Sequence, residues 1–402
     1  MEILKIHNNP ERAEWAALTE RFTREEEEIT RQVTEILADV KSGGDRSLRE
    51  VTRRVEGRDP RTFEIPADVR AAAAALIPAA LKEALAAAKA NIETFHRAQL
   101  PPEVDIETMP GVRCVQRAVP IRRVGLYIPG GKAPLFSTVL MLAVPARVAG
   151  CGEVILCTPA RPDGTIAPEI LYAADLCGVD RIFAVGGAQA VAAMAYGTES
   201  IPHVEKIFGP GNRYVTRAKQ LVSAQAVAVD LPAGPSEVMV LTDNSARAEF
   251  VAADLLSQAE HGGDSQAVLV CPSVEFARDT QRAVGEQLLQ LRRGETIREA
   301  LRQSRIVVLD SREKMIGFAN AYAPEHLIIS MRDAWDVAAQ ITAAGSVFIG
   351  PWSPESAGEY ASGTNHTLPT GGWARACSGV NVDSFMRKIT FQELTRDGLD
   401  AL

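Results

Sequence analysis

Three of the few histidines in this chain lie in polar stretches between expected helices and strands, where a side chain can do chemistry. The chain has six histidines in 402 residues, and the three are His261, His326 and His366. His326 follows Glu325 in AYAPEHLIIS, at the start of an expected strand. An adjacent carboxylate and imidazole can serve as two acid/base groups, one acting on a hydroxyl and one on water. A loop salt bridge explains such a dipeptide more often, so the pair alone leaves both interpretations open.

Two further stretches supply groups that could hold a metal ion. Gln258 and His261 in LLSQAEHGG are three residues apart near an expected helix end, which places both side chains on one face. Neutral imidazole is a common zinc ligand, and an amide oxygen is a less usual one. Glu359 precedes His366 by seven residues in EYASGTNHTLPT, so a carboxylate and an imidazole could enter the same crevice. Surface or helix-capping hydrogen bonds are the commoner role for a Gln/His pair considered alone.

Glycine-rich turns indicate a nucleotide site. They occur in VGLYIPGGKAPLFS, RIFAVGGAQAVAAMA and KIFGPGNRYVT, each between an expected strand and an expected helix. Backbone N–H groups in such turns can approach phosphate oxygens. None of the three has the GxGxxG spacing, and a single turn of this kind is more often a simple strand-to-helix connection. Three in succession favour the nucleotide interpretation.

The elements that must position these groups follow a βαβ pattern. Residues from about 23 to 100 have helical periodicity. After Val124, short β-branched strands alternate with helices, and a second such series follows Ser236. This alternation predicts an α/β fold of two incomplete Rossmann-like, doubly wound domains with mostly parallel sheets, plus helical N-terminal and C-terminal segments.

We therefore divide the chain into four parts. Residues 1–22 form an N-terminal extension. Residues 23–123 and 237–376 form a discontinuous first Rossmann-like domain, into which residues 124–236 are inserted as a second, nucleotide-binding domain. Residues 377–402 are the start of a C-terminal tail. Because no linker-like stretch separates the two series of strands, we expect the domains to pack closely.

Composition excludes several classes of partner. The chain is 46% hydrophobic and 23% charged, which is typical of a globular protein. Its net charge of -8 offers no broad basic surface for nucleic acid or for an anionic membrane. We find no targeting segment and no uncharged apolar run of about 18 residues, so we expect a cytoplasmic protein with a small-molecule partner.

Seven motifs closely resemble, in order and spacing, those of the histidinol dehydrogenase family. They are VGLYIPGG, VGGAQA, FGPGN, LPAGPSEV, LLSQAEHG, PEHL and ASGTNHTLPT, and the resemblance extends from about Thr23 to Leu402. It implies two incomplete Rossmann-like domains, a homodimer with active sites near the subunit interface, one zinc ion per subunit and two successive NAD molecules. The implied reaction is the four-electron oxidation of L-histidinol through bound L-histidinal to L-histidine, the last step of histidine biosynthesis.

The resemblance also implies a role for individual residues. Glu325 and His326 match the catalytic acid/base pair, in which His326 takes a proton in both oxidations and Glu325 activates water. The positions that match nucleotide contacts are Tyr127, Gln189 and Asn212. The positions that match metal ligands are Gln258, His261 and Glu359, where zinc would fix the nitrogens of the substrate. The substrate-binding positions are Ser236, Gln258, His261, Glu325, His326, Glu359 and His366.

The sequence departs from the family pattern in two places. Family members usually carry Asp where this chain has Glu359; the added methylene moves the carboxylate by roughly an ångström, whereas zinc distances tolerate about 0.2 Å. We therefore expect weaker zinc binding or a redistributed ligand set. Family chains also continue into a helical tail whose Glu and His complete the partner's active site, but here no histidine follows His366 and the chain stops at Leu402. We expect a truncated chain or a divergent paralogue with at most three protein ligands.

Two alternative functions follow from the missing tail. One is a related zinc- and NAD-dependent dehydrogenase that acts on another polar primary alcohol. The other is a catalytically silent paralogue that retains ligand binding. The silent protein is disfavoured because it has no physical need to keep the five polar groups Gln258, His261, Glu325, His326 and His366.

Overall fold

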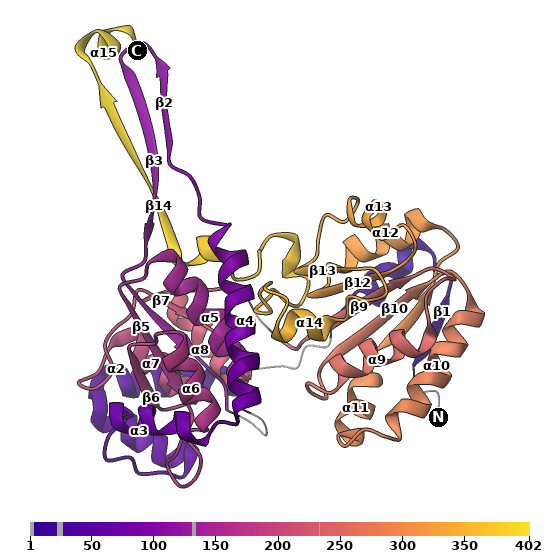
Figure 1. The fold of residues 1–402 in the computed structure, drawn as a ribbon, viewed down its shortest axis with the longest axis horizontal. Helices are drawn as coiled ribbons and strands as arrows, with labels where there is room; N and C mark the ends of the chain where they lie inside the picture. The colour runs from indigo at the N-terminus through magenta and orange to yellow at the C-terminus, as the bar shows by residue number, and fades with distance from the viewer. Residues whose placement is uncertain (1–3, 22–26, 131–133, 233) are drawn as a thin grey trace. The chain divides into compact units, whose positions relative to one another are not determined.

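The computed structural model describes residues 4–21, 27–130, 134–232 and 234–402. The chain forms two compact units (Figure 1). Unit 1 comprises residues 1–26, 231–360 and 366–379, and unit 2 comprises residues 27–230, 361–365 and 380–402. The expected boundary between residues 22 and 23 lies outside the described residues, as do residues 131–133 of the first glycine-rich motif and residue 233 of LPAGPSEV.

Unit 1 is built on a six-stranded parallel sheet in the order β1-β11-β10-β9-β12-β13. If β9 is counted as the first strand, the strands from β11 to β13 have the spatial order 3-2-1-4-5, which is the Rossmann order short of its last strand. Strand β1 is added at the edge, beside β11. The strands are buried on both faces: Val238 and Val240 of β9 contact one hydrophobic cluster, and Met239 and Leu241 contact another. The elements of unit 1 are β1 (Lys5–Asn8), η1 (Arg12–Glu14), α1 (Trp15–Leu18), β9 (Glu237–Thr242), α9 (Ala248–Ala259), β10 (Gln266–Cys271), α10 (Val274–Leu288), α11 (Gly294–Leu301), β11 (Arg305–Val308), α12 (Arg312–Tyr322), β12 (His326–Ser330), α13 (Ala334–Ala338), β13 (Ser346–Ile349), α14 (Glu355–Tyr360) and η3 (Trp373–Arg375).

Unit 2 repeats this arrangement in a five-stranded parallel sheet with the order β6-β5-β4-β7-β8. Here too the order counted along the chain is 3-2-1-4-5, so both units are incomplete Rossmann-like sheets, as the alternating pattern predicted. The elements of unit 2 are α2 (Glu27–Glu56), α3 (Ala67–Ala73), η2 (Ala74–Leu76), α4 (Ala79–Arg97), β2 (Val104–Met109), β3 (Val112–Pro120), β4 (Arg123–Tyr127), α5 (Phe136–Ala149), β5 (Glu153–Thr158), α6 (Pro168–Leu176), β6 (Arg181–Ala184), α7 (Gly187–Tyr196), β7 (Lys206–Phe208), α8 (Arg213–Ser223), β8 (Ala228–Val229), η4 (Val382–Phe385), β14 (Met386–Leu394) and α15 (Arg396–Ala401).

The predicted N-terminal helices are present, and they pack within unit 2. One face of α2 contributes Val33, Ile36 and Val40 to the same hydrophobic cluster as α7 and α8. Gly44 interrupts α2 with a φ of 54°, a conformation that favours glycine, and so divides it into two helical stretches. No single helix among the described residues is long and apolar enough to cross a membrane; the pair Ala67–Leu76 and Ala79–Arg97, bent by 112°, meets that test only when taken together.

The C-terminal segment forms an antiparallel three-stranded sheet that the sequence analysis did not anticipate. Strand β14 pairs with β3 along its whole length, from Met386 opposite Pro120 to Leu394 opposite Val112, and β2 pairs with the other edge of β3. The three strands extend from the body of unit 2 as a narrow ribbon (Figure 1). The helical character expected at this end is limited to the short 3-10 helix η4 before the strand and to α15 after it.

The compact units differ from the domain boundaries that we expected. Residues 27–123 group with 124–230, because α2 packs on α7 and α8 and α4 packs on α5; they do not group with the strands after Ser236. Residues 4–21 are part of unit 1, where β1 pairs with β11 at the sheet edge. Residues 361–365 return to unit 2, where Asn365 Nδ2 donates to the Met141 carbonyl at 2.6 Å. Surface helices share one amphipathic pattern whichever sheet they cover, so the sequence does not reveal which sheet that is.

Candidate active site

The predicted acid/base residues lie where the two central strands of unit 1 begin. Strands β9 and β12 are neighbours, with His326 opposite Val238 in register, and Glu325 immediately precedes β12. Ser236 lies directly before β9. Ligands of open α/β sheets usually bind at the carboxyl ends of the strands. Here the candidate residues gather at the amino ends.

Glu325 and His326 are both held by the backbone of Glu237. The Glu237 N–H donates to Glu325 Oε2 at 2.8 Å, and the Glu237 carbonyl lies 3.0 Å from His326 Nδ1. Because a carbonyl can only accept, Nδ1 carries the hydrogen and Nε2 presents its lone pair. Burial lowers the pKa of His326 to about 4, which keeps the imidazole neutral and able to act as a base. Burial also raises the pKa of Glu325 well above its usual value.

The predicted metal ligands come together around α9 and α14. Gln258 is on the last turn of α9, and the His261 N–H donates to the Gln258 carbonyl at 3.2 Å. Glu359 on α14 pairs with His366, with 3.1 Å between Glu359 Oε1 and His366 Nδ1. The nearby charge of Glu359 opposes the effect of burial on His261, and the pKa of His261 is still lowered. Glu359 and His366 are thus electrostatic neighbours of His261, and Gln258 lies one helical turn before His261.

Two further carboxyl groups lie beside these residues, the buried Glu355 and the half-buried Asp254, and neither was predicted from the sequence. Glu355 precedes Glu359 by one helical turn on α14, and its Oε1 lies 3.8 Å from His326 Nε2. Asp254 precedes Gln258 by one turn on α9. Burial raises the pKa of both groups to about 7. The four-residue spacing from the predicted ligands was the available signal, because it places each side chain on the same helix face as its neighbour.

The donor set fits a bound cation, although two different sets of ligands are possible. The Gln258 side chain is fully buried, and neither its Oε1 nor its Nε2 has a hydrogen-bond partner among the described residues. An amide buried in this state costs free energy unless a ligand satisfies it. His326, Glu355 and Glu359 also offer ligand atoms that lie within 4.8 Å of one another. Glu359 belongs to both sets. We favour the Gln258 set because its orphaned amide has no other evident purpose.

The predicted nucleotide contacts lie in unit 2, at the carboxyl ends of its strands. Tyr127 ends β4, Gln189 is in the first turn of α7, and Asn212 caps α8 by accepting from Tyr214 N and Val215 N. The switch in strand order falls between β4 and β7, which is the usual place for a dinucleotide in such a sheet. Asn212 is exposed, whereas Tyr127 and Gln189 are buried.

Both buried residues already have partners within unit 2. The Tyr127 hydroxyl accepts from Gly187 N at 3.0 Å, and Gln189 Nε2 donates to Glu56 Oε1 at 3.0 Å. The same Glu56 oxygen accepts from Gly186 N, so a carboxylate occupies the amino end of α7. Gln189 Oε1 has no partner among the described residues and is left to accept a further hydrogen bond. The edge thus exposes Asn212 to a ligand, whereas the Gln189 amide oxygen is buried beneath it.

Comparison with known proteins agrees with this arrangement. The family model described as histidinol dehydrogenase matches residues 19–402. Histidinol dehydrogenase of Bacteroides fragilis strain YCH46 is 53% identical over 399 residues, which cover 99% of this chain and 93% of the relative. The enzyme of Escherichia coli O6:H1 is 54% identical over 378 residues, covering 94% of this chain and 86% of the relative.

Solved structures give the same result. The crystal structure of histidinol dehydrogenase from Elizabethkingia anophelis superimposes with a TM-score of 0.97 and 48% identity, covering 100% of this chain and 93% of that one. Succinate-semialdehyde dehydrogenase from Burkholderia pseudomallei shares the fold alone, with a TM-score of 0.51 and 13% identity over 96% of this chain and 88% of that one. The match over nearly the whole chain shows that this α/β dehydrogenase belongs to the histidinol dehydrogenase family.

Proposed function

We propose that the chain oxidises L-histidinol through bound L-histidinal to L-histidine, using zinc and two successive NAD molecules. The observation that carries this proposal is that two acid/base groups hydrogen-bond to the backbone of the same residue, Glu237. One is the neutral imidazole of His326, and the other is the carboxyl of Glu325, whose pKa is raised. Two oxidations separated by the addition of water require one base that acts on hydroxyl groups and one that acts on water.

The two implied groups have separate places. Gln258, His261 and Glu359 would hold zinc, which would satisfy the Gln258 amide oxygen that has no partner among the described residues. Asn212 would contact NAD at the edge of unit 2, with the buried Tyr127 and Gln189 supporting that edge from within. When bound, zinc would position the substrate, and each NAD would accept one hydride.

His326 acts at Nε2 in both oxidations. In the first, Nε2 takes the proton of the alcohol while the hydride leaves the adjacent carbon, and the carbon–oxygen bond becomes the carbonyl of the aldehyde. In the second, Nε2 takes a proton from one hydroxyl of the hydrated aldehyde, again as hydride leaves. His326 must release its first proton between the steps. Glu355, 3.8 Å from Nε2, is the nearest carboxylate that can receive it.

Glu325 acts between the two oxidations. Its carboxylate takes a proton from water as the water oxygen bonds to the aldehyde carbon and gives the hydrated form. A base acts best when its pKa is near the working pH, which suits a buried carboxyl whose pKa lies above the usual range. Substrate contacts are assigned to the same cluster, with Ser236 and His366 added to the metal-binding and acid/base groups. Assembly as a homodimer and location in the cytoplasm remain predictions from the sequence.

The experiment that tests this function counts NADH per substrate molecule. Purified protein would be given L-histidinol and NAD with zinc, and in parallel with a chelator. Formation of two NADH per histidinol, lost with chelator and restored by zinc, is the expected result. One NADH per molecule, or turnover unaffected by chelator, would contradict the proposed chemistry. Turnover of a different polar primary alcohol in preference to histidinol would favour the related dehydrogenase instead.

A further inference from the structure

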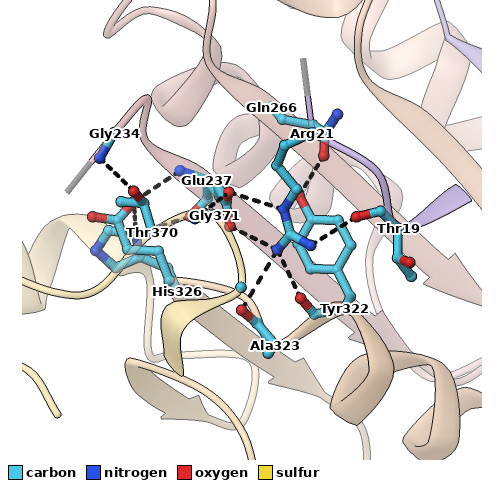
Figure 2. Close-up of polar contacts among 12 residues, drawn as sticks. Thr19, Arg21, Gly234, Glu237, Gln266, Tyr322, Ala323, His326, Thr370 and Gly371 are labelled. Carbon is cyan, nitrogen blue, oxygen red and sulfur yellow. Dashed lines mark hydrogen bonds and ion pairs between the residues drawn. The ribbon is translucent and has the colours of Figure 1, made fainter. Parts of the chain in front are cut away.

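A buried ion pair lies beside the acid/base residues but outside the roles assigned above. Arg21 donates from Nε to Glu237 Oε1 at 3.0 Å and from Nη2 to Glu237 Oε2 at 2.9 Å, so the pair is bidentate (Figure 2). The exposed fractions of the two side chains are 15% and 3%. Burial opposes the charge of Arg21, but the hydrogen bond to Glu237, together with the charge of Glu237 and the interaction with Tyr322, outweighs it and raises the pKa of the guanidinium. The pair is therefore charged and fixed in direction.

Arg21 also holds the turn that leads into Glu325. Its Nη2 donates to the Tyr322 carbonyl at 2.7 Å, and its guanidinium lies 3.5 Å from the centre of the Tyr322 ring. The next residue, Ala323, has a φ of 53°, a left-handed conformation that a non-glycine residue rarely adopts. Only Pro324 separates this turn from Glu325. A strained turn persists where its surroundings determine it, and Arg21 supplies part of that determination.

Glu237 joins the ion pair to both acid/base residues. Its side chain is held by Arg21 and by Gly371 N, which donates to Oε1 at 2.8 Å. Its own N–H and carbonyl hold Glu325 and His326, as described above. A rotation of the Glu237 backbone at the start of β9 would therefore move the hydrogen-bond partners of Glu325 and His326 together. Figure 2 shows Arg21 on one side of Glu237 and His326 on the other.

We propose that Arg21 and Glu237 are positioning residues that set the orientation of Glu325 and His326. Arg21 acts from two sides, through Glu237 at the start of β9 and through the Tyr322–Ala323 turn before β12. A buried ion pair adds little net stability compared with well-packed apolar side chains, so its presence here is better explained by the directions it fixes. The inference rests on the proposed function for its catalytic consequence, but the geometry it describes can be measured without turnover.

The test compares Arg21→Lys with a matched variant, Arg305→Lys. Arg305 is also half-buried and anchors the same N-terminal segment, through the Leu18 carbonyl at 2.9 Å, but no contact joins it to Glu237 among the described residues. Lysine keeps the charge of either arginine and loses the fork of donors. We expect Arg21→Lys to lower kcat about 100-fold with little change in KM, since a 1 Å misplacement can cost that much. Arg305→Lys should keep kcat within about twofold of the unaltered protein.

Histidine NMR provides a readout that does not need activity. With labelled imidazoles, and with the His326 signals assigned by their loss in His326→Asn, Arg21→Lys should shift the His326 Nδ1 resonance. Arg305→Lys should leave that resonance in place. Glu237→Gln should reproduce the Arg21→Lys shift, and added guanidinium should partly restore kcat to Arg21→Ala.

Each outcome decides one of the two ideas. Unchanged His326 resonances in both Arg21→Lys and Glu237→Gln would overturn the positioning role, as would equal loss of kcat in Arg21→Lys and Arg305→Lys. A folded, unaltered protein that does not oxidise histidinol would overturn the proposed function, and the NMR comparison would still decide whether Arg21 orients His326.

Discussion

Replacing Gln258 by leucine should stabilise the metal-free protein while weakening zinc binding. The Gln258 amide is fully buried, and neither of its polar atoms has a partner among the described residues. Leucine removes both atoms and keeps the apolar bulk on the last turn of α9. This substitution separates two effects of the amide: it lowers the unfolding free energy of the metal-free protein, and it contributes to the free energy of zinc binding.

The expected magnitudes follow from the burial and the missing partners. An amide buried without hydrogen bonds costs about 1–3 kcal/mol in protein mutational data, so Gln258→Leu should gain that amount without metal. For a domain of roughly 150–250 residues, each kcal/mol raises Tm by about 2–4 °C. Zinc at 100 times its Kd adds about 2.7 kcal/mol to the wild type. If loss of the amide oxygen weakens binding about 100-fold, the same zinc concentration adds only about 0.4 kcal/mol to the variant.

Thermal unfolding with chelator and with zinc measures both effects, and Gln266→Leu is the matched control. Gln266 is a buried glutamine of the same unit whose amide is bonded on both sides: it accepts from the Tyr322 hydroxyl at 2.5 Å and donates to the Gln303 carbonyl at 3.0 Å. Its replacement should lower Tm in chelator and leave the zinc-induced rise unchanged.

Two results would refute the reasoning about Gln258. If Gln258→Leu unfolds at a lower temperature than the wild type in chelator, the amide is already satisfied in the empty site. If the variant and the wild type show the same rise in Tm with zinc, Gln258 is not a ligand, and the alternative set of His326, Glu355 and Glu359 becomes the better candidate.

Three further predictions concern charge and catalysis. Burial raises the pKa of Asp254 to about 7, so the folded protein binds more protons than the unfolded chain between about pH 4 and 7, and stability is lost as pH rises through that range. Asp254→Asn should remove up to about 4 kcal/mol of this loss, and urea unfolding with chelator should show a clearly larger gain in unfolding free energy at pH 8 than at pH 5. His326→Asn should cripple both oxidations, while Glu325→Gln should chiefly slow oxidation of added histidinal in single-turnover assays; equal slowing of both steps in Glu325→Gln would contradict its assignment to water. Lys219→Met should leave the buried carboxylate of Asp230 without its ion-pair partner, although Asp230 still accepts from Gly209 N at 2.7 Å. Urea unfolding should then show an unfolding free energy lower by about 3–5 kcal/mol. An unchanged midpoint would show that the ion pair makes no net contribution to stability.

The strand-and-helix alternation was sufficient to predict the class of fold. Strands buried on both faces are continuous apolar runs such as EVMVLT, and glycine-bearing turns separate them from helices, so local sequence determines the element type. The parallel sheets and the strand order 3-2-1-4-5 that both units share agree with that prediction. The acid/base dipeptide was also visible, because Glu325 and His326 are adjacent in sequence and share one strand end.

Pairings between distant segments were not predictable from the sequence. Helix α2 has an amphipathic pattern that would suit either sheet, and only tertiary packing places it on α7 and α8. Strand β14 is mostly exposed along its length, so it lacks the apolar alternation that marks a half-buried strand, and its pairing with β3 was missed.

The sequence by itself determined which side chains are available for chemistry, because their types and their close spacings are local. Only the tertiary structure decided which of them share an environment. It buried Glu355 and half-buried Asp254 beside the predicted ligands, left the Gln258 amide without a partner among the described residues and joined Arg21 to Glu237 across 216 residues of chain. Burial and long-range contact set pKa values and the directions of hydrogen bonds, and neither is encoded in a short motif.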